Sequence, residues 1–114
     1  MYLTTEEGLA AFCGRLKSSP TLAIDTEFVR ERTYYHKLGL IQVSDGTACA
    51  AIDPIHISNL EPFLNLIRNQ NTVKVFHAAR QDLEILHRLC NGMIQPVFDT
   101  QIAASVVGWG AQIS

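Results

Sequence analysis

The sequence predicts a mixed α/β fold, and three observations lead to that class. A capped, amphipathic helical pattern opens the chain. Three strand-like runs separated by turn signals follow it, and helical and strand-like segments then alternate. With 114 residues, 47% of them hydrophobic, the chain is long enough for one domain with a buried core and too short for two.

The first part of the chain is predicted to form a helix and three antiparallel strands. Thr4 and Glu7 form a capping-box pattern ahead of apolar residues at helical spacing, and Ser18-Ser19-Pro20 ends that pattern. Asp45-Gly46 is a strong turn signal between two of the strand-like runs. Strands are predicted over 21–28, 38–44 and 48–52. We expect these consecutive strands to pair as an antiparallel meander.

The second part is predicted to add helices and one further strand. Apolar residues at helical spacing indicate a helix that closes near Asn69, and a short buried strand follows over 73–77. A helix is predicted over 81–89, with Leu83, Leu86 and Leu89 facing inward. Asp99 can cap a last helix that runs to Val107. No closing strand or helix pattern follows, so we expect the closing helices of the domain beyond Ser114.

Composition limits the classes of function. The net charge is −2 and the pI is about 6.0, so no global positive field draws the chain to nucleic acid, and binding to a polyanion must be local. Three widely spaced cysteines without a C-x-x-C pair argue against a zinc site and a disulfide framework. The sequence contains neither a signal-peptide pattern nor an apolar run long enough to span a membrane. We expect a cytoplasmic protein without membrane partners.

Three carboxylates are the best candidates for chemistry: Asp25, Glu27 and Asp82. Asp25 and Glu27 are two residues apart on a predicted strand, so both side chains should lie on one face of the sheet. Two like charges side by side need a counter-ion, which can be a basic partner, solvent or a hard divalent cation. Structural alternatives remain open for each acid. Asp25 can cap a turn, Glu27 can pair with Arg30 or Arg32, and Asp82 can favour the helix dipole.

The surroundings of these acids resemble a known family. Ala23-Ile24-Asp25-Thr26-Glu27-Phe28-Val29-Arg30, continuing to Gln42, resembles the first exonuclease motif of ribonuclease D, and His77-Ala78-Ala79-Arg80-Gln81-Asp82-Leu83-Glu84 resembles the second. Phe98-Asp99-Thr100-Gln101 is similar to the segment that follows the second motif. Ribonuclease D belongs to the DEDD superfamily of 3′-to-5′ exonucleases, whose fold is ribonuclease H-like. The resemblance extends from about residue 3 to residue 113 and implies part of such an exonuclease domain over 1–114.

The resemblance also implies a mechanism and a substrate. Asp25, Glu27 and Asp82 match three of the four metal-binding catalytic acids of the superfamily. Two Mg²⁺ or Mn²⁺ ions, roughly 3.5–4 Å apart, would activate a water and stabilise the leaving oxygen during phosphodiester hydrolysis. Thr26, Phe28 and His77 would contact the terminal nucleotide. The implied function is trimming of RNA 3′ ends, including those of tRNA precursors and other structured RNAs.

Alternatives remain beside this interpretation. Phe28 can be a core residue and His77 a satisfied core histidine, while the basic and aromatic segment 30–37 can bind a phosphate backbone or form a solvated loop. The third motif of the family, with the fourth acid and a tyrosine that orients water, should lie beyond Ser114. We therefore expect the 114-residue chain to be inactive or weakly active alone. The alternative function is a non-catalytic remnant that binds nucleic acid or protein, and surface left uncovered by truncation would favour self-association.

Overall fold

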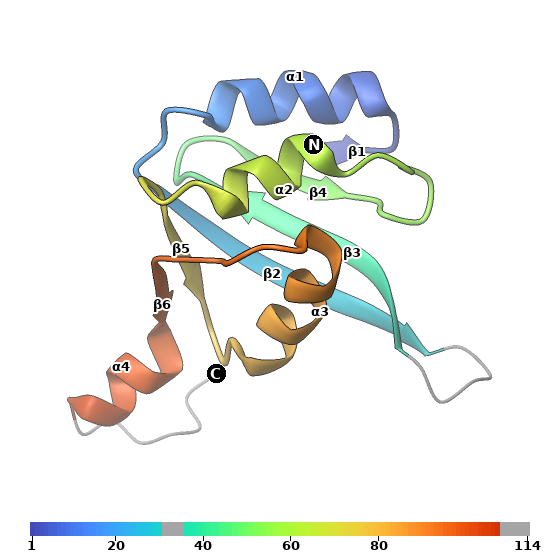
Figure 1. Cartoon of the computed structure of the whole chain (residues 1–114). Coiled ribbons are helices and arrows are strands. Elements are labelled where there is room, and N and C mark those ends of the chain that lie inside the picture. The colour runs from blue at the N-terminus through green and yellow to red at the C-terminus, as the bar shows by residue number, and fades with distance from the viewer. Residues whose placement is uncertain (31–35, 108–114) are drawn as a thin grey trace.

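A mixed sheet of six strands forms the body of the described structure, a computed structural model that covers residues 1–30 and 36–107 (Figure 1). Its strands are β1 (Tyr2–Leu3), β2 (Thr21–Arg30), β3 (His36–Ser44), β4 (Cys49–Ile52), β5 (Val73–Phe76) and β6 (Val97–Asp99). The helices are α1 (Glu6–Leu16), α2 (Glu61–Arg68), α3 (Arg80–Cys90) and α4 (Thr100–Val106). No helix among the described residues is both long enough and apolar enough to cross a bilayer.

The sheet has the order β1-β4-β3-β2-β5-β6. The predicted meander is confirmed, because β3 pairs antiparallel with both β2 and β4. Parallel strands extend it on both sides: β1 pairs with β4, β5 pairs with β2, and β6 pairs with β5. The sequence prediction missed β1 and β6, which are only two and three residues long. A period-two pattern is not recognisable in strands that short.

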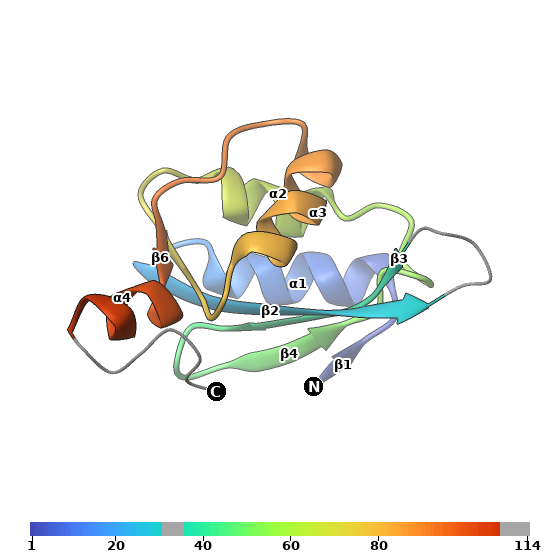
Figure 2. The same ribbon diagram turned by 90° about the horizontal axis from the view of Figure 1, so that it is seen from below.

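Helices α1, α2 and α3 cover one face of the sheet (Figure 2). Their apolar residues pack against the inward side chains of β2, β3 and β4, and several of them are fully buried, including Leu9, Leu22, Ile41, Phe63 and Leu86. In β2 the inward positions are Leu22, Ile24 and Thr26, and the alternate positions are exposed. The core therefore determines which face of β2 each side chain occupies.

Two details of the predicted helices are wrong. The N-cap of α1 is Thr5 rather than Thr4, and its hydroxyl accepts a hydrogen bond from the Gly8 amide at 3.1 Å. The capping box is therefore absent, because the third helical position holds a glycine and not Glu7. In α3 Leu89 is exposed, whereas Cys90 is buried. The buried face follows Asp82, Leu86 and Cys90 at four-residue intervals, which moves Leu89 onto the solvent side.

A buried lysine connects α2, β5 and the segment before β6. Lys74 points inward from β5 and is fully buried, and its ammonium group donates hydrogen bonds to the carbonyl oxygens of Asn69 and Gln95. The Gln95 contact is 2.9 Å long. Burial lowers the pKa of Lys74. The two carbonyl groups offset part of the cost of taking this amine out of water and align β5 with its neighbours.

The first strand is tied to the sheet by the carboxylate of Asp53, which follows β4. Tyr2 donates its hydroxyl to this carboxylate at 2.9 Å, the His56 ring nitrogen Nδ1 lies 2.6 Å from it, and the Ile55 and His56 amides also donate to it. Burial alone would raise the pKa of Asp53, but the bonds from His56, Tyr2 and the two amides outweigh burial and lower the pKa to about 2.

We expect this carboxylate to make the protein sensitive to acid. Since the pKa of Asp53 is about 2 in the folded state and ~3.9 in an unfolded chain, its contribution is present above pH ~4 and is lost as the pH falls toward 2. Urea unfolding midpoints between pH 5 and pH 2.5 should fall less steeply for Asp53→Asn than for wild type. Glu7→Gln, which changes an exposed carboxylate of α1, is the control and should keep the wild-type slope. Equal slopes for wild type and Asp53→Asn would contradict this role.

Candidate active site

Asp25 and Glu27 project from the face of β2 that α1, α2 and α3 leave uncovered. Both side chains are exposed, whereas the alternate residues Ile24 and Thr26 are buried. The expectation that both acids share one face is therefore confirmed. Asp25 lies in the middle of β2, so it does not cap a turn. The alternative pairing of Glu27 with Arg30 or Arg32 involves side chains that lie outside the described part of the chain.

The cross-strand neighbours of these acids are neutral. In the β2–β3 register Asp25 lies opposite Gln42, and Glu27 lies opposite Leu40. Neither side-chain carboxylate has a hydrogen bond or ion pair with any residue of 1–29 or 37–107. Two like charges at adjacent outward positions, with an amide beside them, leave carboxylate oxygens free for a ligand. The period-two pattern could have indicated Gln42 as a neighbour, but its register against Asp25 was not readable from the sequence.

An irregularity in the β2–β3 pairing lies beside Glu27. The register shifts between Glu27 and Phe28, where β3 carries one extra residue, Gly39. A β-carbon at Gly39 would come within 2.3 Å of the Val29 side chain, so only glycine permits this close approach. The bulge lets Leu38 return to the core although Leu40 faces outward. Bulges of this kind often lie next to functional sites, where they redirect side chains.

Asp82 lies on the covered side of β2, where Thr26 holds it. It is the third residue of α3, and only 6% of its surface is exposed. The hydroxyl of Thr26 donates a hydrogen bond to Oδ1 of Asp82. Burial raises the pKa of Asp82, the Thr26 bond lowers it, and the charges of Asp25 and Glu27 raise it further, so that the net shift is upward. The three acids therefore interact electrostatically although Asp82 occupies a different side of the strand.

The donor set suits a hard divalent cation, but it is only partly assembled. Carboxylate oxygens are the ligands that Mg²⁺ and Mn²⁺ prefer, and Asp25 and Glu27 offer free oxygens on one face. Within the described ranges, however, no three His, Cys, Asp or Glu side chains surround a common point. Asp25 and Glu27 thus fit as a pair of ligands. Asp82 interacts with them through charge and is held by Thr26.

His77 is the residue after β5 and is exposed, so the alternative of a buried core histidine is wrong. Its ring nitrogen Nδ1 lies 2.8 Å from the hydroxyl oxygen of Thr100. The same hydroxyl lies 3.2 Å from the Phe76 carbonyl oxygen, and when it donates to that carbonyl its oxygen accepts from Nδ1–H. In this tautomer of the neutral ring, Nε2 is the nitrogen that can accept a hydrogen bond from a ligand.

The other predicted contact residues have mixed surroundings. Phe28 is half-buried and packs against the core, which agrees with its structural alternative. The Thr26 side chain faces Asp82, so only its backbone lies beside the outward face. The prediction for the basic and aromatic segment 30–37 falls mostly on residues 31–35, which lie outside the described part of the chain.

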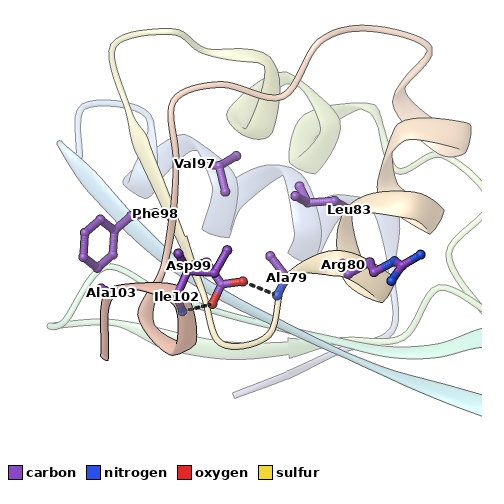
Figure 3. A pocket seen from close by; sticks show the side chains of 8 residues that line it. All are labelled: Ala79, Arg80, Leu83, Val97, Phe98, Asp99, Ile102 and Ala103. Atoms are coloured by element: carbon purple, nitrogen blue, oxygen red, sulfur yellow. Dashed lines mark hydrogen bonds between the residues drawn. The ribbon is translucent and has the colours of Figure 1, made fainter. Parts of the chain in front are cut away.

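A groove between α3, β6 and α4 was not predicted. Its volume is about 470 Å³, and its lining is largely apolar (Figure 3). It is lined by Ala79, Arg80, Leu83, Val97, Phe98, Asp99, Ile102 and Ala103. Asp99 is the predicted cap of the last helix, and this role is confirmed because its carboxylate accepts hydrogen bonds from the Gln101 and Ile102 amides. Burial opposes ionisation of Asp99, but its backbone hydrogen bonds prevail and lower its pKa.

We expect the Thr26 hydroxyl to stabilise the buried carboxylate of Asp82. Thr26→Val keeps the shape of the side chain but removes the donor, and an unpaired buried carboxylate should lower the free energy of unfolding by about 1–3 kcal/mol at pH 7. Thr26→Ser keeps the hydroxyl and should retain most of the stability. Urea unfolding of the three proteins measures the difference. If the valine variant is as stable as wild type, the hydrogen bond contributes nothing.

Comparisons with known proteins show the family of the chain. A family model described as 3′-5′ exonuclease matches residues 1–114. Ribonuclease D of Jannaschia sp. (strain CCS1) is 49% identical over 116 residues, which cover 97% of this chain and 30% of that protein. Ribonuclease D of Escherichia coli (strain K12) is 42% identical over 112 residues, which cover 95% of this chain and 30% of that protein. The chain thus spans about 30% of the length of these curated relatives.

Solved structures show the same fold. The crystal structure of Escherichia coli RNase D, described as an exoribonuclease involved in structured RNA processing, superposes with a TM-score of 0.92 at 39% identity and covers 100% of this chain and 30% of its own. The catalytic core of RRP6 from Trypanosoma brucei has a TM-score of 0.88 at 28% identity, covering 97% and 31%. The predicted ribonuclease H-like α/β class is confirmed. The chain belongs to the 3′-5′ exonuclease family and within it is similar to ribonuclease D.

Proposed function

We propose that these residues form part of the active site of a 3′-to-5′ exoribonuclease of ribonuclease D type. The observation that carries the proposal is the pair Asp25 and Glu27, which are exposed on one face of β2 and unpaired within the described structure. Neither carboxylate has a basic or amide hydrogen-bond partner among the described residues, so both keep oxygens available for a ligand. The match of the 3′-5′ exonuclease model to residues 1–114, a range that includes both acids, supports the proposal.

Divalent metal ions are the proposed cofactors, and two of them, Mg²⁺ or Mn²⁺, would act together. Asp25 and Glu27 would bind through their free oxygens, and we propose Asp82, whose carboxylate interacts with both through charge, as the third acid of the set. Bound ions of this kind supply an activated water and neutralise charge that develops on a phosphodiester. The contribution of the chain itself is to hold acidic oxygens in a fixed register, with the ring of His77 fixed by Thr100 nearby.

The proposed substrate is the 3′ end of an RNA, including those of tRNA precursors and other structured RNAs. Its support is the description of the Escherichia coli relative as an enzyme of structured RNA processing. The backbone at Thr26, the ring of Phe28 and Nε2 of His77 are the proposed contacts with the terminal nucleotide. The exposed position of His77 supports its part in this set, whereas Phe28 is half-buried against the core.

The cysteines support a cytoplasmic location for this activity. All three, Cys13, Cys49 and Cys90, are free thiols in the described structure. Burial raises the pKa of Cys13 to about 11, so this thiol stays protonated and unreactive at neutral pH. We place the protein in a reducing compartment on this ground.

Metal binding tests the proposal without requiring activity. Calorimetric titration with Mn²⁺ should show binding to wild type, and Asp25→Asn should weaken it at least tenfold because a free carboxylate is lost. Glu84→Gln, which changes an exposed acid of α3 that pairs with Arg88, should bind as wild type does. Unchanged binding in Asp25→Asn would overturn the proposed function.

RNA trimming provides the second measurement. On RNA labelled at its 5′ end, the 114-residue chain should act slowly or not at all, since three acids should bind the second ion weakly. Any trimming should require Mg²⁺ or Mn²⁺, disappear in Asp25→Asn and stop at a 3′-phosphate. Fast trimming by the chain would contradict the expected weakness, and trimming that survives in Asp25→Asn would count against the assigned site.

We also propose that the chain self-associates through the exposed apolar face of α4. Ile102 and Val106, one helical turn apart, are 63% and 81% exposed, and Phe98 beside them is 49% exposed. Apolar side chains grouped in this way favour burial against another surface. This face also favours the alternative function, a non-catalytic module that binds a protein partner.

Sedimentation velocity measures this association. Wild type should show a dimer fraction that rises with concentration, and Ile102→Ser combined with Val106→Ser should shift the distribution to monomer because the apolar contact area is lost. Ser105→Ala, on the same helix, should leave the distribution unchanged. A wild-type protein that stays monomeric at every concentration would contradict the proposed self-association.

A further inference from the structure

We propose that Asp99 and Thr100, at the junction of β6 and α4, are positioning residues that hold the turn carrying His77 and Asp82. This inference rests on the proposed function, because it concerns residues of the same site. The turn runs from His77 at the end of β5 to the first residues of α3. Neither Asp99 nor Thr100 is exposed enough to be a simple surface group, since both are partly buried.

The carboxylate of Asp99 joins two helices that are distant in sequence. It accepts hydrogen bonds from the Gln101 and Ile102 amides at the start of α4, which is ordinary capping. It also accepts from the Ala78 amide at 3.0 Å and from the Ala79 amide at 2.7 Å, both just before α3. Figure 3 shows Asp99 between these two segments. Capping of α4 alone would not require the second pair of bonds.

The bonds to Ala78 and Ala79 hold a strained part of the backbone. Ala78 has a φ of 56°, in the left-handed region that residues with a β-carbon rarely adopt. Such a conformation persists only where the surroundings impose it. The two hydrogen bonds from this turn to one ionised carboxylate supply that constraint. The left-handed turn redirects the chain out of β5, so that α3 begins at Arg80 and Asp82 falls opposite Thr26.

Thr100 adds a second attachment to the same turn. Its hydroxyl is hydrogen-bonded to Nδ1 of His77 and lies within hydrogen-bond distance of the carbonyl oxygen of Phe76. The two residues of this junction thus have separate roles. Thr100 fixes the ring of His77, and Asp99 fixes the backbone of the turn that leads to Asp82. The first backbone hydrogen bond of α3 runs from the Leu83 amide to the Ala79 carbonyl oxygen at 2.8 Å, directly after the turn that Asp99 holds. The amide proton of Leu83 is therefore a reporter of the conformation of this turn.

A substitution can separate bridging from capping. In Asp99→Ser the shorter hydroxyl can still cap α4 but cannot reach Ala78 and Ala79. The amide proton of Leu83 should then exchange with solvent at least tenfold faster, while that of Val107, bonded to Ala103 within α4, should change less than twofold. Hydrogen exchange followed by NMR on the 114-residue chain measures both.

A second substitution provides the rescue. Glycine adopts a positive φ without the steric cost that alanine bears, so Ala78→Gly in the Asp99→Ser background should return Leu83 exchange to within about threefold of wild type. Mn²⁺ affinity, measured by calorimetry on the same proteins, should fall about tenfold in Asp99→Ser and recover in the double variant. A role limited to capping α4 predicts no rescue by a residue in the other segment.

The outcomes separate this inference from the proposed function. Unchanged Leu83 exchange in Asp99→Ser, equal acceleration at Leu83 and Val107, or failure of Ala78→Gly to restore protection would each overturn the positioning role. Unchanged Mn²⁺ affinity in an Asp99→Ser protein with faster Leu83 exchange would also overturn it, since the turn would then not serve the site. If wild type binds no Mn²⁺ through Asp25, the proposed function fails, and Leu83 exchange alone decides whether Asp99 holds the turn.

Discussion

The parallel pairing of β2, β5 and β6 is the constraint on which the candidate site depends. Parallel neighbours place their carboxyl ends at the same edge of a sheet, and open α/β sheets form ligand sites at such edges. Asp25 lies at the middle of β2 and Glu27 in its second half, His77 follows β5, and Asp99 ends β6. Three segments separated by more than twenty residues therefore come together without any direct signal in the local sequence.

Several unfavourable features gather at that edge. Asp25 and Glu27 repel each other, Asp82 is buried, and Ala78 adopts a left-handed conformation. Hydrogen bonds elsewhere offset these costs, from Thr26 to Asp82 and from the turn amides to Asp99. Local rules of stability are commonly broken at functional sites and compensated nearby. The concentration of such features near the carboxyl ends of β2 and β5 agrees with a functional origin.

The sequence predicted what short-range periodicity determines. The period of two in β2 placed Asp25 and Glu27 on one face, and the capping preference of aspartate identified Asp99 at the start of α4. Contacts between distant segments were not readable, because no local pattern encodes them. The hydrogen bond from Thr26 to Asp82 spans 56 positions, and that from Ala79 to Asp99 spans 20. The edge strands β1 and β6 were missed because their side chains are too few to form a pattern.

The two faces of β2 connect the core to the candidate chemistry. Leu22 and Ile24 are held in the core, so the register that buries them also exposes Asp25 and Glu27. A slip of one residue would bury both acids and expose the apolar side chains, at a large cost in free energy. Thr26, between the two acids, faces Asp82 from the covered side. The contact between α3 and the sheet therefore reaches the two acids through one residue, Thr26. In this way contacts on the helix-covered face of β2 can fix the positions of side chains on its exposed face.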